Sequence, residues 1–240
     1  MTFAIQSFNW EMITINNFID VMAFGAHPDD VEIGAGGFVA KECALGYKVA
    51  IVDLTKGEMG TRGNVEERMK ESFNASQILN LTFRENLGFS DRHLEITDDY
   101  IGPIVKLMRI HRPSIVVAPY WIDRHPDHVK ASELITEAHF SSGLRKYMPE
   151  IEPYRPPYLF YYFINKAENI SFICDVSEYY DLKKASILAH DSQFEGKYPY
   201  SLESRDRYFG SQIKKLYGEG FASRNPIQIS DPAGLWRNVR

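Results

Sequence analysis

Short apolar runs, rich in β-branched residues, alternate along the chain with longer amphipathic stretches. The apolar runs predict five buried strands, at 21–26, 48–54, 114–120, 158–165 and 171–176. The amphipathic stretches predict helices at 33–45, 65–79, 98–111, 127–140, 177–190 and 201–218. Strands that alternate with helices through right-handed crossovers form parallel sheets. The pattern therefore predicts a single-domain, Rossmann-like α/β fold with an open, mostly parallel sheet and helices on both faces.

The first 18 residues stand apart from this alternation. They are moderately apolar, but they include Glu11 and contain no lysine or arginine, so they lack the positive region of a secretory signal. We expect 1–18 to be an N-terminal extension, either a flexible arm or the result of an over-extended start for which Met12 would serve. The domain itself is then expected to span 19–240.

The composition argues against several classes of protein. A net charge of −5, from 27 basic and 32 acidic residues, argues against a nucleic-acid-binding surface. No apolar run approaches the roughly 20 residues of a membrane span. The two cysteines, Cys43 and Cys174, lie far apart and are expected to be reduced thiols. We therefore expect a cytoplasmic protein that binds neither nucleic acid nor membrane.

Two polar motifs each begin just past a predicted strand, at 27–30 (His-Pro-Asp-Asp) and at 125–128 (His-Pro-Asp-His). Open α/β sheets place their ligand sites at the C-terminal ends of the strands. Three protein ligands from such residues would leave a fourth position open, as in catalytic zinc sites. Helix caps and turns explain a single motif of this kind equally well. Two motifs at separate strand ends favour a metal site.

The predicted fold also raises a dinucleotide-binding hypothesis. Glycines follow the first strand at 34, 36 and 37, and Asp53 ends the second strand. A phosphate-binding loop, however, needs glycine at the position of His27. Asp29 and Asp30 would also place two negative charges beside a pyrophosphate. The metal hypothesis is therefore preferred.

The two motifs resemble those of the PIG-L/LmbE-like zinc-dependent N-acetylglucosamine deacetylases. Further motifs at 54–63, 86–92, 192–194 and 217–221 resemble the bacillithiol-biosynthesis branch, whose members deacetylate N-acetylglucosaminyl-malate. The resemblance extends from about residue 20 to about residue 229. It implies a hydrolase that converts an amino-sugar conjugate, N-acetylglucosaminyl-malate, into glucosaminyl-malate and acetate.

Two alternatives stay open. The first keeps the chemistry and changes the substrate to another N-acetyl amino sugar, of the chitooligosaccharide or glycolipid type. The second is a non-catalytic zinc- or sugar-binding protein. The resemblance also implies a homo-oligomer.

The resemblance implies a role for each residue of the two motifs. His27, Asp30 and His128 are expected to hold one Zn²⁺ per chain, although imidazole and carboxylate ligands accept Fe²⁺ or another divalent ion as well. Asp29 is expected to be the base toward water and then the acid toward the departing amine. His125, as an imidazolium, is expected to donate to the oxyanion that develops on the acetyl carbonyl.

Substrate contacts are expected from basic side chains, which suit malate carboxylates, and from polar ones, which suit sugar hydroxyls. Arg68 matches the family's sugar-binding arginine best, and Asp91 resembles a residue that bonds sugar hydroxyls. Asp127 is expected either to orient His125 or only to cap a helix. His190 is expected either to line the pocket or to lie on the surface at a helix end. The complete set of expected contacts is Arg68, Asp91, Arg92, Arg124, Asp127 and His190.

Overall fold

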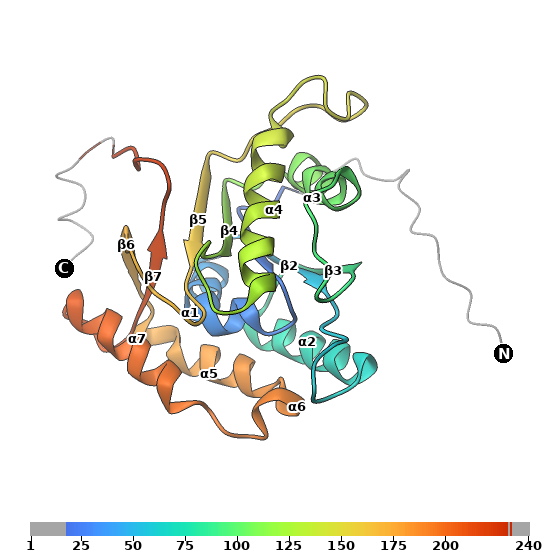
Figure 1. Cartoon of the computed structure of the whole chain (residues 1–240). Helices are drawn as coiled ribbons and strands as arrows, with labels where there is room; N and C mark the ends of the chain where they lie inside the picture. The colour runs from blue at the N-terminus through green and yellow to red at the C-terminus, as the bar shows by residue number, and fades with distance from the viewer. Residues whose placement is uncertain (1–17, 230, 232–240) are drawn as a thin grey trace.

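A computed structural model describes residues 18–229 and 231, so residues 1–17 of the extension expected at 1–18 lie outside the described residues. The fold is a single α/β domain in which helices flank both faces of one sheet, as the sequence predicts (Figure 1). The strands are β1 (Val21–Gly25), β2 (Val49–Thr55), β3 (Phe83–Phe89), β4 (Ile115–Pro119), β5 (Tyr158–Tyr162), β6 (Phe172–Asp175) and β7 (Gly218–Ala222). The helices are α1 (Asp30–Ala44), α2 (Val65–Leu79), α3 (Asp98–His111), α4 (Pro126–Ser142), η2 (Ser177–Tyr179), α5 (Tyr180–Leu188), α6 (Asp191–Phe194) and α7 (Tyr200–Gln212).

The strand order reverses between β1 and β4, which makes this the topological switch point of the sheet. The sheet runs β3-β2-β1-β4-β5-β7-β6. The five strands from β3 to β5 in this order are parallel to one another, whereas β7 is antiparallel to both β5 and β6. The chain builds outward from β1 in one direction and from β4 in the other. A ligand crevice opens where the strand order reverses in this way, outside the carboxyl ends of the strands. Each of the two polar motifs follows one of these two strands.

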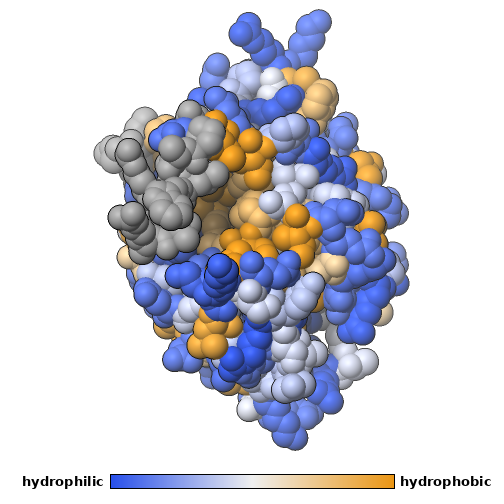
Figure 2. All heavy atoms as spheres, turned by 90° about the vertical axis from the view of Figure 1, so that its left-hand side faces the viewer, coloured by the Kyte–Doolittle hydropathy of each residue, from blue (hydrophilic) through white to orange (hydrophobic). Residues whose placement is uncertain are grey.

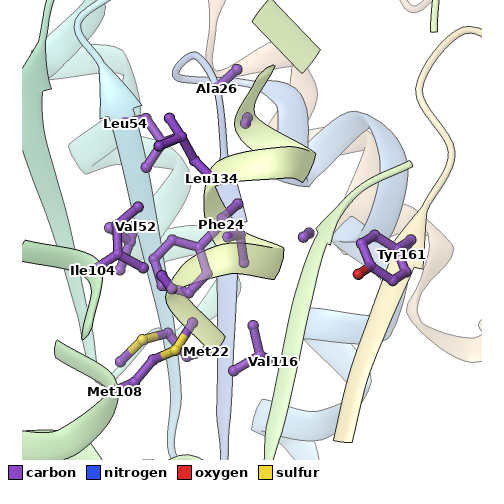
Figure 3. Close-up of a cluster of buried hydrophobic side chains, with 14 of the residues drawn as sticks. Met22, Phe24, Ala26, Val52, Leu54, Ile104, Met108, Val116, Leu134 and Tyr161 are labelled. Carbon is purple, nitrogen blue, oxygen red and sulfur yellow. The ribbon is translucent and has the colours of Figure 1, made fainter. Parts of the chain in front are cut away.

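The central strands are buried on both faces, which explains their continuous apolar runs. Met22 and Phe24 of β1 pack into a core beneath α3 and α4 (Figure 3). Val21 and Ala23 of the same strand point the other way, into a second core beneath α1. Each of these four residues is at most 1% exposed. Burial of apolar side chains on both faces stabilises β1 through the hydrophobic effect. The motif that follows β1 therefore starts from a rigid support.

The apolar pattern gives no bounds for β3 and β7. The helix that it predicts at 201–218 is longer than the helix in the structure. That helix, α7, ends at Gln212, and β7 begins at Gly218. A Cβ at Gly218 would lie 2.7 Å from a methyl carbon of Ile173, so only glycine allows these segments to approach so closely. Both strands carry charged side chains whose partners lie far away in the sequence. Arg84 of β3, for example, pairs with Asp53 through two hydrogen bonds of 2.7 and 2.9 Å.

The buried carboxylate of Glu219 accepts hydrogen bonds from the backbone in the middle of α1. The helix is interrupted at Ala35, whose backbone is non-helical (φ −142°). The Glu219 carboxylate of β7 accepts the backbone N–H groups of Gly37 and Phe38 just beyond this kink, at 2.9 and 2.6 Å. The fully buried ammonium of Lys183 lies 2.6 Å from the same carboxylate and balances its charge. The helix that starts at the first motif is therefore tied to β7 and α5.

Among the described residues, no helix is long and apolar enough to cross a membrane. Both cysteines are free thiols. Viewed from the side of β6 and α7, the surface is mainly hydrophilic, with a hollow that is bordered by hydrophobic residues (Figure 2).

Candidate active site

The fold brings the two polar motifs together at the crevice. The first motif occupies the turn between β1 and α1, and the second lies at the start of α4, after the loop that leaves β4. Because β1 and β4 are adjacent and parallel, both turns emerge at the same edge of the sheet. The ring centroid of His27 lies 4.9 Å from that of His125 and 5.5 Å from that of His128. The three imidazoles therefore share one small volume.

Asp30 lies between two of these imidazoles. One carboxylate oxygen is 3.4 Å from Nδ1 of His27, and the other is 3.1 Å from Nε2 of His128. Ligand atoms around a tetrahedral zinc with bonds of about 2.0–2.1 Å lie about 3.3–3.4 Å apart. The backbone N–H of His27 also donates to Asp30 Oδ2 at 2.9 Å, which fixes the carboxylate. Asp30 therefore contacts the two imidazoles through different oxygens, and the imidazole and carboxylate donors are of the type that suits a divalent cation.

Carboxylates also lie close to the second ring nitrogen of both His27 and His128. Nε2 of His27 is 3.3 Å from an oxygen of Asp127 and 3.3 Å from one of Asp91. Nδ1 of His128 is 3.1 Å from an oxygen of Asp123. Histidines that bind a metal usually donate their other N–H to a carboxylate or carbonyl, which fixes the ring. The inner nitrogens, Nδ1 of His27 and Nε2 of His128, are thereby left for the ion.

The electrostatics of the cluster favour positive charge. Burial alone would lower the pKa of His27, but hydrogen bonds to Asp127, Asp30 and Asp91 outweigh it and raise the pKa to about 12. The pKa of His128 is raised to about 9 in spite of burial, chiefly by the charge of Asp30. A site that retains protons so strongly also attracts a cation, and the two compete for the same nitrogens.

Two groups of three side chains lie within ligand range of one another among the described residues, and Asp30 belongs to neither of them. In each, the three donor atoms are within 4.8 Å of one another; the groups are His27, His125 and His128, and His27, Asp91 and Asp127. Both share His27 with the set that the resemblance implies. A cation on the inner nitrogen of His27, beside Asp30, leaves the carboxylates of Asp91 and Asp127 free to orient the ring. The set with Asp30 therefore accounts for more of the surrounding contacts.

Asp29 has an unusual backbone conformation beside this cluster. Its φ of 123° lies in a region that L residues rarely adopt, and its ψ is −24°. Strained residues of this kind concentrate at functional sites. Burial, and then the negative charge of Asp30, raise the pKa of its carboxyl to about 6. A carboxyl group with such a pKa can take up and release a proton near neutral pH.

His125 caps α4, and this contact determines its tautomer. Its Nδ1 accepts a hydrogen bond from the backbone N–H of Asp127 at 3.2 Å, so the proton of the neutral ring lies on Nε2. Burial, and then the neighbouring His128 and His27, lower the pKa of His125. The structure thus favours a neutral imidazole that donates through Nε2, where the sequence analysis expected an imidazolium. The carboxylate of Asp127 contacts His27 and Arg92, and not His125.

The expected substrate contacts separate into exposed and buried residues. Arg92 has 45% of its side chain exposed, and its backbone N–H donates to Asp127 at 3.0 Å. Arg124 is exposed beside His125. Asp91 is buried and accepts the backbone N–H of Met59 at 2.9 Å. Of the expected basic contacts, Arg92 and Arg124 are exposed next to Asp127 and His125, at the rim of the cluster.

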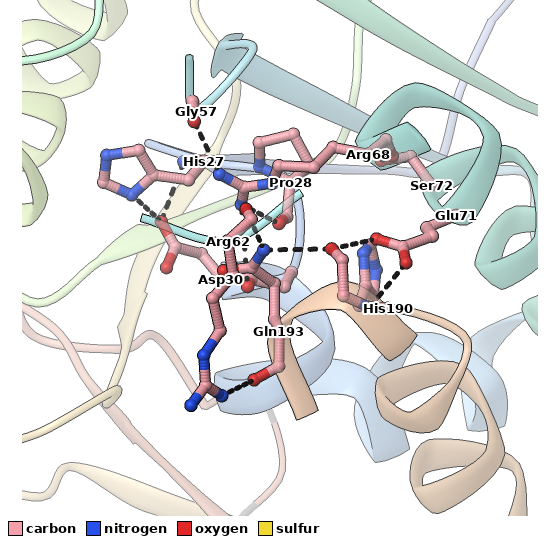
Figure 4. Close-up of polar contacts among 12 residues, drawn as sticks. His27, Pro28, Asp30, Gly57, Arg62, Arg68, Glu71, Ser72, His190 and Gln193 are labelled. Carbon is pink, nitrogen blue, oxygen red and sulfur yellow. Dashed lines mark hydrogen bonds and ion pairs between the residues drawn. The ribbon is translucent and has the colours of Figure 1, made fainter. Parts of the chain in front are cut away.

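His190 and Arg68, unlike the rim residues, are buried, and Figure 4 shows both near the first motif. The His190 side chain has no exposed surface, and its Nε2 lies 3.2 Å from a carboxylate oxygen of Glu32. It therefore lies neither on the surface nor against an open pocket. Glu32 in turn pairs with Arg84 at 2.5 Å. His190 thus belongs to a buried ionic network beneath the first motif.

Asp123 and Glu32 were not predicted from the sequence as site residues, although each belongs to one of the motif regions. Asp123 lies five residues before His128, and its carboxylate also accepts the backbone N–H of His125 at 2.8 Å. Glu32 lies in the first turn of α1, two residues after Asp30. Its closeness in sequence to the first motif was the available signal for Glu32. The position of Asp123 just past the third predicted strand was the available signal for Asp123.

The fold and the site together define an α/β protein with a candidate cation site at the C-terminal edge of its sheet. The sequence profile of the family described as GlcNAc-PI de-N-acetylase (PIG-L) matches residues 22–139. The diacetylchitobiose deacetylase of Thermococcus kodakarensis is 30% identical, over 85% of this chain and 83% of that protein. A conserved protein of Thermus thermophilus is 41% identical over 90% of this chain and 98% of its own, and its crystal structure superposes with a TM-score of 0.84.

The chain belongs to the PIG-L family. Within the family, a probable N-acetyl-α-D-glucosaminyl L-malate deacetylase of Bacillus subtilis is 28% identical, over 73% of this chain and 84% of that protein. This identity is close to that of the diacetylchitobiose deacetylase. The comparisons therefore confirm the family and do not favour its bacillithiol branch.

Proposed function

We propose that this protein is a metal-dependent deacetylase that hydrolyses the acetamide of an N-acetylglucosamine-type sugar. The observation that carries the proposal is the cluster at the crevice, where Asp30 lies between two imidazoles and a second carboxylate, Asp29, is left over beside them. Family membership and the deacetylase relatives support the same reaction. The strained conformation of Asp29 also suits a catalytic role, since strained residues cluster at active sites.

His27, Asp30 and His128 are the residues that would hold the ion. When bound, a divalent cation supplies Lewis-acid chemistry, which polarises the acetyl carbonyl and lowers the pKa of water. We propose Zn²⁺, on the precedent of zinc sites with two histidines and one carboxylate. The same ligands also suit Fe²⁺. The carboxylates on the outer nitrogens of both imidazoles keep these two ligands oriented.

Asp29 and His125 would carry the proton transfers and the charge stabilisation. The Asp29 carboxylate accepts a proton from a water molecule while the oxygen of that water molecule bonds to the acetyl carbon. The Nε2–H of His125 donates a hydrogen bond to the carbonyl oxygen as negative charge develops there. When the C–N bond breaks, Asp29 returns the proton to the sugar nitrogen, and the products are acetate and a free amine.

We propose a malate conjugate, N-acetylglucosaminyl-malate, as the preferred substrate. The support is the pair of exposed arginines at the rim, Arg92 and Arg124, because a guanidinium group suits a carboxylate. The alternative is a neutral chitooligosaccharide, which the relative from Thermococcus kodakarensis favours. The free thiols suit a cytoplasmic protein, and we retain that location and a homo-oligomeric state as predictions.

The ratio of kcat/KM for the malate conjugate to that for free N-acetylglucosamine tests this preference. A charge-assisted hydrogen bond contributes about 1.5–3 kcal/mol, so each carboxylate contact is expected to raise the ratio roughly 10- to 100-fold. Arg92→Ala and Arg124→Ala should each lower the ratio and spare the slow reaction on the free sugar. Arg207→Ala, on α7 and paired with Glu203, is the control and should leave the ratio unchanged.

Equal kcat/KM values for the two compounds would contradict the malate assignment. A preference for diacetylchitobiose over both would assign the protein to the neutral sugars. Either result would leave the deacetylation chemistry in place.

A further inference from the structure

We propose that four charged side chains, largely buried, hold α1 in its interrupted form and thereby position Asp30 for the ion. This inference rests on the proposed function, and it gives a role to the motif at 217–221, which the proposed reaction does not use. The four are positioning residues, and we call them the ionic clamp. In the order in which they contact one another, they are Arg205, Asp206, Lys183 and Glu219.

The interruption at Ala35 divides α1 into two helical segments. Each end of a helix leaves backbone groups that have no partner inside the helix. The break therefore creates unpaired carbonyl groups at the end of the first segment and unpaired N–H groups at the start of the second. A side-chain oxygen at the residue before a helix usually accepts such N–H groups, but the side chain of Ala35 is a methyl group. Both sets of groups need partners from elsewhere in the fold.

Glu219 of β7 supplies the acceptor that Ala35 lacks. Its two carboxylate oxygens accept the N–H groups of Gly37 and Phe38, the second and third residues after Ala35. An N-cap side chain serves these same two positions, and a negative charge at the start of a helix also suits the helix dipole. Position 37 has no room for a larger residue, because a Cβ there would lie 2.8 Å from the Cβ of Val176. Glu219 thus caps the second segment from outside the helix.

Arg205 of α7 bonds the carbonyl on the other side of the break. Its Nη2 donates to the carbonyl of Ile33 at 2.6 Å. Its Nη1 donates to the carbonyls of Phe163 and Ile164, just past β5, at 2.9 Å each. One guanidinium therefore ties the first segment of α1 to the chain that leaves β5.

Asp206 and Lys183 join the two ends of the ionic clamp. The Asp206 carboxylate lies 3.0 Å from Nε of Arg205 and 2.7 Å from Nζ of Lys183, and the same ammonium lies 2.6 Å from Glu219. Lys183, Asp206 and Glu219 are each at most 1% exposed. Buried ion pairs contribute little to stability compared with apolar residues of similar volume. The clamp therefore serves to specify one conformation of α1 more than to stabilise the fold.

The first segment of α1 begins with the proposed ligand Asp30. Ile33 lies three residues later, so less than one helical turn separates the carbonyl that Arg205 bonds from the ligand. The backbone of this turn approaches β5 so closely that a Cβ at Gly34 would lie 2.1 Å from the ring of Tyr162. A continuous α1 would orient this first turn differently and would move the Asp30 carboxylate from its place between the two imidazoles. The clamp thus sets the geometry of a ligand that it does not touch.

The affinity of the metal-free protein for Zn²⁺ tests the proposal, measured by competition with a chromogenic chelator. Groups that orient metal ligands typically contribute about 10- to 100-fold to metal affinity, so Arg205→Ala should weaken Zn²⁺ binding by about that factor. Arg205 is the most exposed member of the clamp, with 16% of its side chain exposed, so its removal should leave the fold intact. Glu219→Gln, which keeps the shape of the side chain and removes its charge, should weaken binding in the same direction.

Arg207→Ala is the matched control for these variants. Arg207 lies two residues further along α7, is exposed and pairs with Glu203 at 2.8 Å. The control should bind Zn²⁺ with the affinity of the wild type. Wild-type affinity in Arg205→Ala would overturn the proposal.

A double-mutant cycle with Asp30→Ala separates a positioning role from a general loosening of the fold. If the clamp acts through Asp30, its loss should matter little once that ligand is gone. Arg205→Ala should therefore weaken Zn²⁺ binding by less than about threefold when Asp30 is already replaced. Direct titration measures the weaker affinity that the remaining imidazoles provide. An equal loss of affinity with and without Asp30 would overturn the proposal.

Hydrogen exchange separates the failure of this inference from the failure of the proposed function. If the wild type binds no divalent ion and hydrolyses no acetamido sugar, the proposed function fails. The exchange rates of the amides at 33–38 then decide whether the clamp holds the break, since amides in a loosened segment exchange faster. These rates should rise in Arg205→Ala and stay at the wild-type level in Arg207→Ala. Unchanged rates in Arg205→Ala would overturn the inference.

Discussion

Asp29→Asn is expected to lower turnover by a factor on the order of 10² or more while the metal content stays at the wild-type level. The change removes the group that takes up and returns the proton, and it leaves His27, Asp30 and His128 intact. Asparagine suits the test because it tolerates a positive φ at least as well as aspartate. The backbone strain at this position is therefore retained. Initial rates and metal analysis on the same preparations measure the two quantities.

Asp99→Asn is the control for this substitution. Asp99 is an exposed carboxylate in the first turn of α3, outside the cluster at the crevice. Its replacement should leave both turnover and metal content unchanged. Activity of Asp29→Asn close to that of the wild type would show that another group is the base.

Loss of the metal ion is the second large effect expected. Purified protein should hold about one divalent ion per chain, in keeping with a three-ligand site. His128→Ala and Asp30→Ala should each lose that ion during dialysis and should show no measurable turnover. Asp30→Ala removes the carboxylate that lies between the two imidazoles. Plasma emission spectrometry of the dialysed proteins measures the stoichiometry.

His139→Ala serves as the matched control because His139 lies in the same helix, α4. Its Nε2 pairs with the carbonyl of Pro156 at 2.8 Å, away from the second motif. This variant should keep one ion per chain. Stoichiometric metal that survives dialysis in both His128→Ala and Asp30→Ala would show that the ligands are different residues.

Much of this fold can be predicted from the sequence because its central strands are buried on both faces. The runs at 21–26 and 48–54 correspond to β1 and β2, whose residues are all buried. The two motifs could be placed in one site because parallel strands end at the same edge of the sheet. Local pattern and chain topology are enough for these features.

The remaining features depend on pairs of residues that are distant in the sequence. β3 and β7 carry charged residues because Arg84 meets Asp53 and Glu219 meets Lys183, and no periodicity reveals such partners. The same limit applies within the site. Arg68, for example, donates to a carbonyl 40 residues away, a contact that no motif predicts. A motif identifies the residue type, but only the fold shows which atoms the side chain reaches.

The most direct test of the central claim is to measure acetate and free amine released from N-acetylglucosaminyl compounds by the metal-loaded protein. The compounds are the malate conjugate, diacetylchitobiose and free N-acetylglucosamine. We expect acetate and amine in equal amounts from at least one of them. Release should cease when the metal is removed by a chelator and return when Zn²⁺ is restored. No release from any of the three by fully loaded wild-type protein, or release that persists without metal, would contradict the central claim.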